Sequence, residues 1–162
     1  MRTTEVEFGE RVRDVWERDH ARLWRSVLAW SGSAEVASDA VAEAFAQVLR
    51  RGDDVHDPAA WVWRAAFRIA GGLLAEKRPL PLPDGPGPEP PATTGDPADS
   101  LALVTALSTL EERDRRVVVL ALVGGWTAEE IATLDESSPG AVRVRLHRAR
   151  QRVRDALEVH HG

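Results

Sequence analysis

The feature that most restricts the fold of this 162-residue sequence is a proline-rich segment near its middle. Residues 79–99, PLPLPDGPGPEPPATTGDPAD, contain eight of the ten prolines and no aromatic residue. Such a composition can neither continue a helix nor bury an apolar core, so it predicts an extended, acidic linker. We therefore predict two small domains, residues 1–78 and 101–162, joined by a flexible Pro-rich linker over residues 79–100.

Apolar residues in the first domain recur at helical spacing. A stripe from Phe8 to Trp30 predicts a first helix that ends at Ser31-Gly32-Ser33. A second helix is expected over residues 34–51. Asp57-Pro58 is suited to be the N-cap and first residue of a third helix. The alternation typical of strands is absent. We expect an all-α protein whose first domain is a bundle of three or four helices, with its five tryptophans mostly in the core.

Sequence patterns typical of helix N-termini divide the second domain into short helices. They are two overlapping capping boxes in Ser108-Thr109-Leu110-Glu111-Glu112, a further box in Thr127–Glu130, and the N-cap and proline pair Ser138-Pro139. Gly124-Gly125 is expected to end the helix between the first two. A short helix, a turn of about four residues and a basic second helix predict a helix-turn-helix.

The last helix is strongly basic although the chain has a net charge of −5. Residues 143–154 hold six arginines, one histidine and no acid. At about 100° per residue, one packing stripe forms and the arginines lie on the remaining faces. The stripe consists of Val142, Leu146, Ala149, Val153 and Leu157. A solvated helix face normally mixes charges, so this run favours a polyanionic partner over a merely solvated face, which stays open as the alternative.

In a helix-turn-helix, the N-terminal turn of the second helix enters the DNA major groove, and arginines further along contact phosphates. The residues expected to contact DNA are Ser138, Ala141, Arg143, Val144, Arg145, His147 and Arg148.

The predicted turn departs from ordinary helix-turn-helix chemistry. Such turns usually have glycine near the position of Glu136, where the backbone adopts a positive φ, and an apolar residue at that of Ser137. Glutamate in that conformation costs roughly 1 kcal/mol. We also expect Asp135 and Glu136 to lie near the DNA-facing side, where their charge opposes binding.

Taken together, the two sets of motifs resemble an extracytoplasmic-function (ECF) sigma factor, the small two-domain class of the sigma-70 family, over about residues 8–157. In residues 34–51, the family's acid, glutamine, acid and phenylalanine positions hold Asp39, Ala42, Glu43 and Phe45. Residues 58–70 resemble its Pro-x-x-Trp-Leu helix: Pro58, Trp61 and Arg64 match, whereas its asparagine and aspartate positions hold Arg68 and Gly72. The fourth-domain pattern matches at Glu130, Ile131, Ala132, Val142, Arg145, Leu146, His147, Arg148 and Ala149.

This resemblance implies a subunit that binds core RNA polymerase, directs it to promoters and is held inactive by an anti-sigma factor. Asp39, Ala42 and Glu43 would contact the polymerase clamp helices. The loop at residues 51–57 and the helix after it would bind the melted minus-10 strand. On that helix, the aromatic and cationic residue types that hold single-stranded DNA are Trp63, Arg64, Phe67 and Arg68. The second domain would bind the minus-35 element.

Two other functions stay open. Departures in the first domain are compatible with a helix-turn-helix regulator that binds duplex DNA but has lost promoter melting. Asp135 and Glu136 are compatible with a sigma-like adaptor that acts through protein contacts alone.

An enzyme is not expected, because His20 and His56 are isolated and Gly-rich phosphate loops are missing. We expect no cofactor and no metal site. The sequence has no cysteine, its first residues do not resemble a signal peptide, and its longest apolar run, residues 117–123, is too short to span a bilayer. We therefore expect a cytoplasmic protein without membrane insertion.

Overall fold

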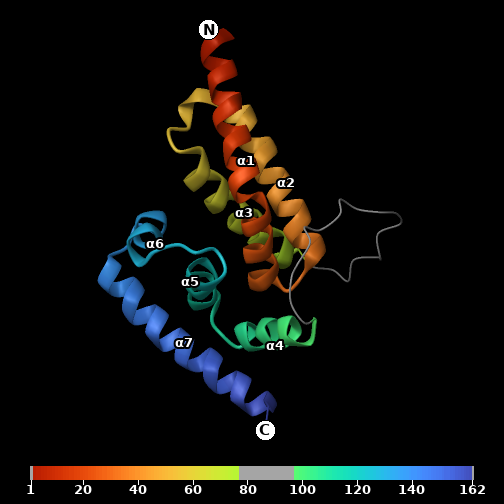
Figure 1. Ribbon diagram of the computed structural model, residues 1–162, viewed down its shortest axis with the longest axis vertical. Coiled ribbons are helices and arrows are strands. Elements are labelled where there is room, and N and C mark those ends of the chain that lie inside the picture. Colours follow the sequence, from red (N-terminus) through yellow and green to blue (C-terminus); the bar gives the residue numbers. More distant parts are fainter. Residues whose placement is uncertain (1, 77–96, 162) are drawn as a thin grey trace. The chain divides into compact units, whose positions relative to one another are not determined.

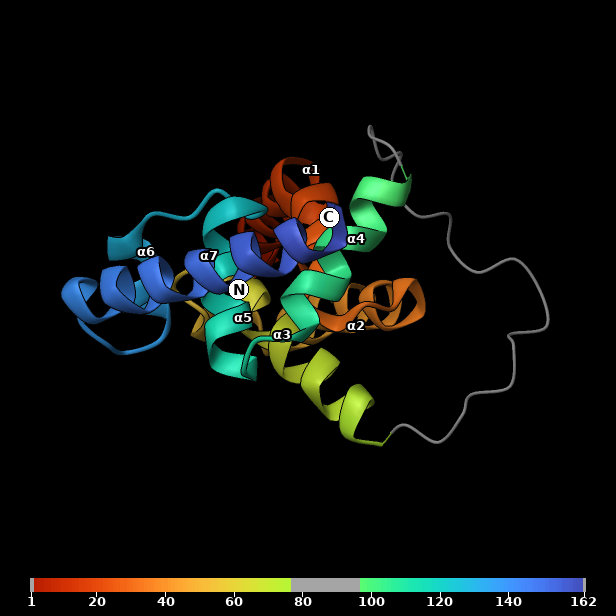
Figure 2. The same cartoon turned by 90° about the horizontal axis from the view of Figure 1, so that it is seen from below.

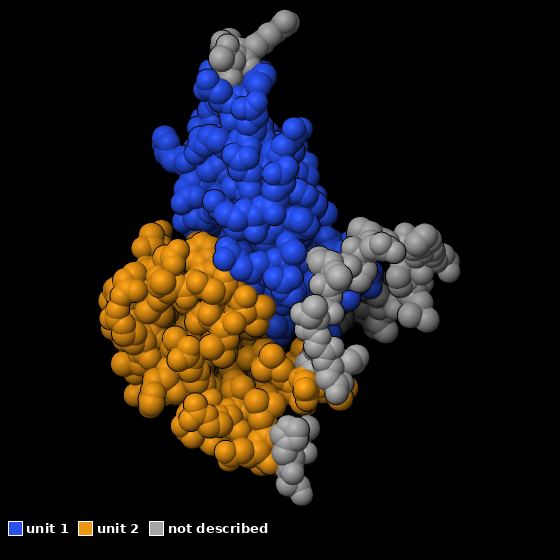
Figure 3. All heavy atoms as spheres, in the orientation of Figure 1, with its two compact units in different colours: residues 1–91 blue, residues 92–162 orange. Residues whose placement is uncertain are grey.

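The computed structural model describes residues 2–76 and 97–161. The chain divides into two compact units, residues 1–91 and 92–162, which Figure 3 shows in blue and orange. Every regular element of the described residues is a helix, which confirms the all-α prediction. Most of the predicted linker lies outside the described residues, but residues 97–100 are helical rather than part of a linker.

Residues 2–76 of the first unit form a bundle of three α-helices, labelled in Figure 1. Helix α1 spans Arg2–Ser31, α2 spans Ala34–Arg51 and α3 spans Pro58–Ala75, and each packs against the other two. A short 3-10 turn, η1 (Gly52–Asp54), follows α2 within the expected loop. The predicted bounds of α2 and the predicted start of α3 are confirmed.

Local chemistry explains where these helices begin and end. The Ser33 hydroxyl accepts a hydrogen bond from the Val36 N–H at 3.2 Å, and the Asp57 carboxylate accepts one from the Ala60 N–H at 3.1 Å. Each caps a helix whose first N–H groups have no partner within the helix. Gly52 follows α2 with a φ of 68°, a conformation that glycine adopts without steric cost.

Large apolar side chains fill the core of the bundle. All three helices contribute to it, and the four residues Leu23 and Val27 of α1, Val48 of α2 and Trp63 of α3 are each 0% exposed. Three of the five tryptophans, Trp24, Trp30 and Trp63, are buried. Trp61 is half-buried and Trp16 is 42% exposed.

Residues 97–161 of the second unit form four helices. They are α4 (Pro97–Ser108), α5 (Glu112–Leu122), α6 (Ala128–Leu134) and α7 (Pro139–His161). Helix α7 packs against each of the other three, and in Figure 2 it crosses the view as the long blue helix. The short helices surround a core whose largest fully buried side chains are Leu107, Leu120 and Ile131.

Two of the predicted caps in this unit are confirmed. The Thr127 hydroxyl accepts from the Glu130 N–H at 3.1 Å while the Glu130 carboxylate accepts from the Thr127 N–H at 3.0 Å, which completes a capping box at α6. The Ser138 hydroxyl accepts from the Ala141 N–H at 3.2 Å, and Pro139 is the first residue of α7.

The capping boxes predicted at Ser108 and Thr109 are wrong. Their hydroxyls donate to the carbonyls of Thr105 and Ala106, each at 2.6 Å, and so bond backward to α4. Helix α5 starts after Glu111 without a side-chain cap. The hydroxyls satisfy the free carbonyls at the end of one helix rather than the free N–H groups at the start of the next.

Candidate nucleic-acid interface

Helix α7 is held to its unit by the predicted apolar stripe. Val142, Ala149 and Val153 are buried, and Leu146 and Leu157 are half-buried. The residues expected to contact DNA lie on the other faces: Ala141, Arg143, Val144, His147 and Arg148 are exposed, and Arg145 is partly so. The stripe therefore fixes α7 while it leaves a cationic surface open to a partner.

The turn before α7 adopts the backbone geometry that its position predicts. Glu136 has a φ of 53° and is the one non-glycine residue with a positive φ in the described ranges. The Ser137 N–H donates to the Ala132 carbonyl at 2.9 Å, which closes the turn. The Ser137 side chain is exposed and fills no apolar space between the helices.

The side chain of Asp135, which was expected near the DNA-facing side, is engaged within its own unit. Its carboxylate forms an ion pair with the guanidinium of Arg116 on α5. Both side chains are mostly covered, with 19% of Asp135 and 35% of Arg116 exposed. Asp135 therefore ties the end of α6 to α5, and of the two acids in the turn only Glu136 is open to solvent.

Acids on neighbouring helices pair with three arginines of α7. Glu129 on α6 pairs with Arg143. Asp114 on α5 has one carboxylate oxygen 3.7 Å from Arg145 Nε and the other 3.9 Å from Arg152 Nη1. Sequence reasoning missed these pairs because it compared charges within α7 alone.

The other three arginines of α7 make no ion pair within residues 2–76 and 97–161. They are Arg148, Arg150 and Arg154, and all are exposed. Arg148 lines a hollow of 520 Å³ between the start of α5 and the first turns of α7. The rest of the lining is Glu111, Arg113, Asp114, Gly140, Ala141, Val144, Arg145 and Arg152. The hollow has the size and charge to receive an anionic partner.

On α3, the structure separates the four residues expected to bind the melted strand. Arg64 and Arg68 are exposed, whereas Trp63 is 0% and Phe67 is 3% exposed. The rings of Trp63 and Phe67 present no open face in this fold, so the expected aromatic platform on α3 is absent from the described surface. Trp63 and Phe67 lie on the side of α3 that packs into the bundle. Of the three aromatic residues of α3, only the half-buried Trp61 is partly accessible.

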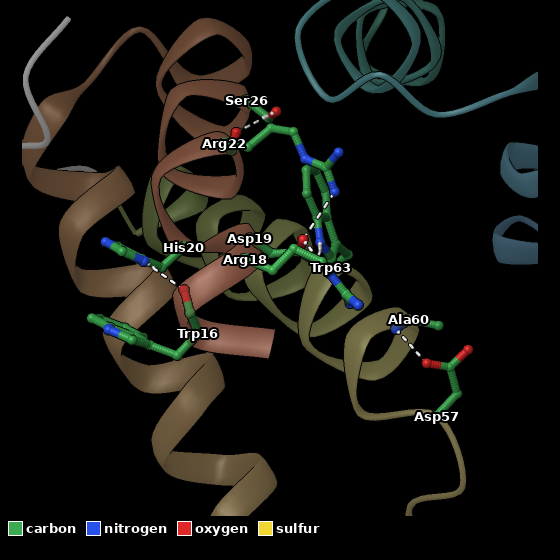
Figure 4. Close-up of polar contacts among 9 residues, drawn as sticks. All are labelled: Trp16, Arg18, Asp19, His20, Arg22, Ser26, Asp57, Ala60 and Trp63. Carbon is green, nitrogen blue, oxygen red and sulfur yellow. Dashed lines mark hydrogen bonds and ion pairs between the residues drawn. The ribbon is translucent and has the colours of Figure 1, made fainter. Parts of the chain in front are cut away.

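A buried carboxylate explains why Trp63 faces inward (Figure 4). Asp19 of α1, with 3% of its side chain exposed, accepts the Trp63 indole N–H at 3.1 Å. Its other oxygen lies 3.0 Å from both Arg18 Nε and Arg22 Nη2. The hydrogen bond to Asp19 and its charge raise the pKa of Arg18 above the usual value. Arg18, Asp19 and Arg22 are close in sequence, but Trp63 lies 44 residues from Asp19, so local sequence patterns do not predict the contact between them.

The three residues expected to contact polymerase share one exposed face of α2. Asp39, Ala42 and Glu43 follow each other at helical spacing and are all open to solvent. The Glu43 carboxylate accepts from Gln47 Nε2 at 3.1 Å and pairs with Arg50 Nη2 at 2.9 Å. Both hydrogen bonds lower the pKa of Glu43, and the one from Gln47 has the larger effect. The Glu43 side chain is therefore charged near neutral pH.

An apolar groove lies between α1 and α2. It has a volume of 580 Å³ and includes Val6, Trp16, Phe45 and Leu49. Leu49 of α2 is 55% exposed. The edge of Phe45 meets the Trp16 ring at a centroid distance of 4.9 Å, which supports the groove wall.

No described helix combines the length and apolar character needed to cross a membrane. Within the same residues, no three His, Asp or Glu side chains gather in an arrangement suited to a metal ion.

The chain is similar in sequence to known proteins. A family model described as "Sigma-70, region 4" matches residues 100–153. The RNA polymerase sigma factor CarQ of Myxococcus xanthus is 44% identical over 62 residues, which cover 38% of this chain and 36% of CarQ. The ECF RNA polymerase sigma factor SigL of Mycobacterium tuberculosis is 27% identical over 160 residues, which cover 91% of this chain and 89% of SigL.

A comparison with solved structures extends the likeness to the fold. The sigma factor RpoE from Bartonella quintana, solved in complex with the anti-sigma factor NepR, superposes with a TM-score of 0.64 at 18% identity. The match covers 94% of this chain and 98% of RpoE. At this identity the superposition bears on the fold, and the family follows from the sequence matches. The chain is a divergent member of the ECF group of the sigma-70 family of RNA polymerase sigma factors.

Proposed function

We propose that this transcription initiation factor binds core RNA polymerase through the first unit and recognises the minus-35 element of promoters through α7 of the second. It acts by binding rather than by catalysis. In the first unit, the face of α2 with Asp39, Ala42 and Glu43 binds polymerase, and Arg64 and Arg68 of α3 face the minus-10 strand.

The observation that carries the DNA-binding part is the surface of α7. Its apolar stripe is packed against its own unit, whereas six arginines within residues 143–154 project from the other faces. Ser138 caps the helix, so its first turn is well formed and its free N–H groups favour an anion. Arginine contacts with phosphate make DNA binding depend on salt, with a log-log slope of about −0.9 for each phosphate neutralised.

The face of α2 is suited to a cationic partner. Asp39 and Glu43 are exposed acids, and the lowered pKa of Glu43 keeps its charge when the pH falls toward ordinary carboxylate values. Charges at the rim of an interface mainly affect the association rate and its salt dependence.

Retention of core RNA polymerase by the immobilised full chain tests this assignment. Asp39→Arg combined with Glu43→Arg should reduce retention at least tenfold, because both charges are reversed. Glu35→Arg is the matched control, since Glu35 is an exposed acid at the start of the same helix. Equal retention by the double variant and the control would contradict the placement of the polymerase surface on α2.

A second candidate function is supported by the burial of Trp63 and Phe67. Without an aromatic platform on α3, the protein binds duplex DNA as a regulator and leaves melting to other factors. Fluorescence of 2-aminopurine placed in the minus-10 region separates the two functions. An increase on addition of chain and core polymerase together supports initiation, and sequence-specific binding without that increase supports the regulator.

The adaptor alternative has lost part of its support. It rested on two acids near the DNA-facing side, and Asp135 pairs with Arg116 instead.

We also propose an anti-sigma factor as a partner, in the manner of the RpoE complex with NepR. Such a partner would cover the polymerase-binding face of α2 or the basic face of α7. Protection of Glu43 or Arg148 from chemical labelling in the complex would locate it.

A further inference from the structure

Asp114 lies at the start of α5, opposite the basic helix, and minus-35 recognition by α7 alone does not require it. Its two carboxylate oxygens lie 3.7 Å from Arg145 Nε and 3.9 Å from Arg152 Nη1. The two arginines are two helical turns apart on the same side of α7. One carboxylate is therefore shared by two cations, and the three side chains together carry a single positive charge.

The acid is the fixed member of this group and the arginines are the adjustable ones. Asp114 is 21% exposed, whereas Arg145 is 39% and Arg152 is 61% exposed. The position in the first turn of α5 also favours a carboxylate, because the free N–H groups there carry partial positive charge. Ion pairs this exposed are weak, so a DNA phosphate or base can replace the carboxylate as a partner.

Both arginines line the hollow between α5 and α7, together with Arg148, which has no ion pair in the described ranges. A guanidinium that is held in place makes a directional contact with a base edge, and a free one binds any phosphate within reach. The hollow thus combines one unpaired cation with two that Asp114 draws toward the start of α5.

We propose that Asp114 is a positioning residue for DNA recognition: it orients Arg145 and Arg152 in the hollow and cancels part of their charge. The sequence preference of α7 then depends on a residue that contacts no DNA itself. This inference rests on the proposed binding of DNA by α7.

Binding by the full chain assembled with core RNA polymerase tests the inference. Duplexes selected from a library with a randomised minus-35 segment are compared with scrambled duplexes over a range of salt concentrations. Asp114→Asn should raise the affinity for scrambled duplexes about three- to tenfold at 0.1 M salt and steepen the salt slope by about 0.9, as one released charge predicts. The affinity for selected duplexes should change less, so the ratio of the two affinities falls about threefold or more.

Glu111→Gln is the matched control. Glu111 lines the same hollow and makes no ion pair with a described residue, so its loss changes the charge equally without releasing an arginine. It should raise both affinities by the same factor. Asp114→Glu, which keeps the charge, should keep the salt slope. If thermal melting shows that the Asp114→Asn variant does not fold, Asp114→Ser is used in its place, because it also removes the carboxylate.

Each outcome is decisive. A lower affinity ratio in Asp114→Asn but not in Glu111→Gln supports the inference. Equal effects of the two variants would mean that Asp114 acts only through its charge, and this result would overturn the inference. A wild-type assembly that selects no sequence would instead overturn the proposed function itself, and the inference with it.

Discussion

Glu136 crosses the turn between α6 and α7 with a φ of 53°, a conformation that costs a non-glycine residue about 1 kcal/mol or more. Its side chain is exposed. Glu136→Gly should therefore stabilise the second unit by about 1 kcal/mol, because glycine adopts this φ without the clash of a Cβ. Thermal unfolding followed by circular dichroism measures the gain.

Glu136→Ala separates the backbone effect from the charge. It removes the same carboxylate but keeps a Cβ, so its stability should stay within about 0.5 kcal/mol of the wild type. If alanine stabilises the unit as much as glycine does, the charge rather than the positive φ is the cause.

At the scale of helices, Asp19 ties α1 to α3 through Trp63. Asp19→Asn should lower the free energy of unfolding of the first unit by about 2 kcal/mol, because a buried charged acceptor with three hydrogen-bond donors is lost. Urea denaturation followed by tryptophan fluorescence is suitable, since five of the six tryptophans lie in this unit. Asp14→Asn, at an exposed site on the same helix, should change stability little, and an equal loss there would contradict the buried tie.

In the proposed complex, different arginines of α7 contact different parts of the duplex. Arg148 lies in the hollow beside the first turns, whereas Arg154 lies well beyond them on another face. Arg148→Ala should weaken binding to selected sequences more than to scrambled ones. Arg154→Ala should weaken both equally and make the salt slope shallower by about 0.9. The two variants are matched in charge, so identical effects in a binding assay would contradict the placement of the first turns in the major groove.

At the scale of the whole chain, local signals were sufficient for most of the fold. The Ser31-Gly32-Ser33 break, the Asp57-Pro58 pair and the Thr127 capping box act within a few residues, and helices α2, α3 and α6 begin where they predict. The site was harder to predict, because contacts between distant segments decide it. Burial against α1 turns Trp63 inward, and Asp114 reaches α7 from another helix.

Serine and threonine show the limit of the local signals most clearly. Ser108 and Thr109 match the pattern of an N-cap, yet the end of one helix and the start of the next compete for the same hydroxyls. A capping pattern placed between two closely spaced helices therefore does not predict which helix receives the bond.

Run-off transcription with core RNA polymerase on a promoter library tests the central claim most directly. The chain and core polymerase together should produce discrete transcripts whose templates share one minus-35 and one minus-10 sequence. Arg148→Ala should reduce these transcripts about tenfold while core polymerase is still retained. Transcription that is the same with and without the chain, or templates that share no sequence, would contradict its function as an initiation factor.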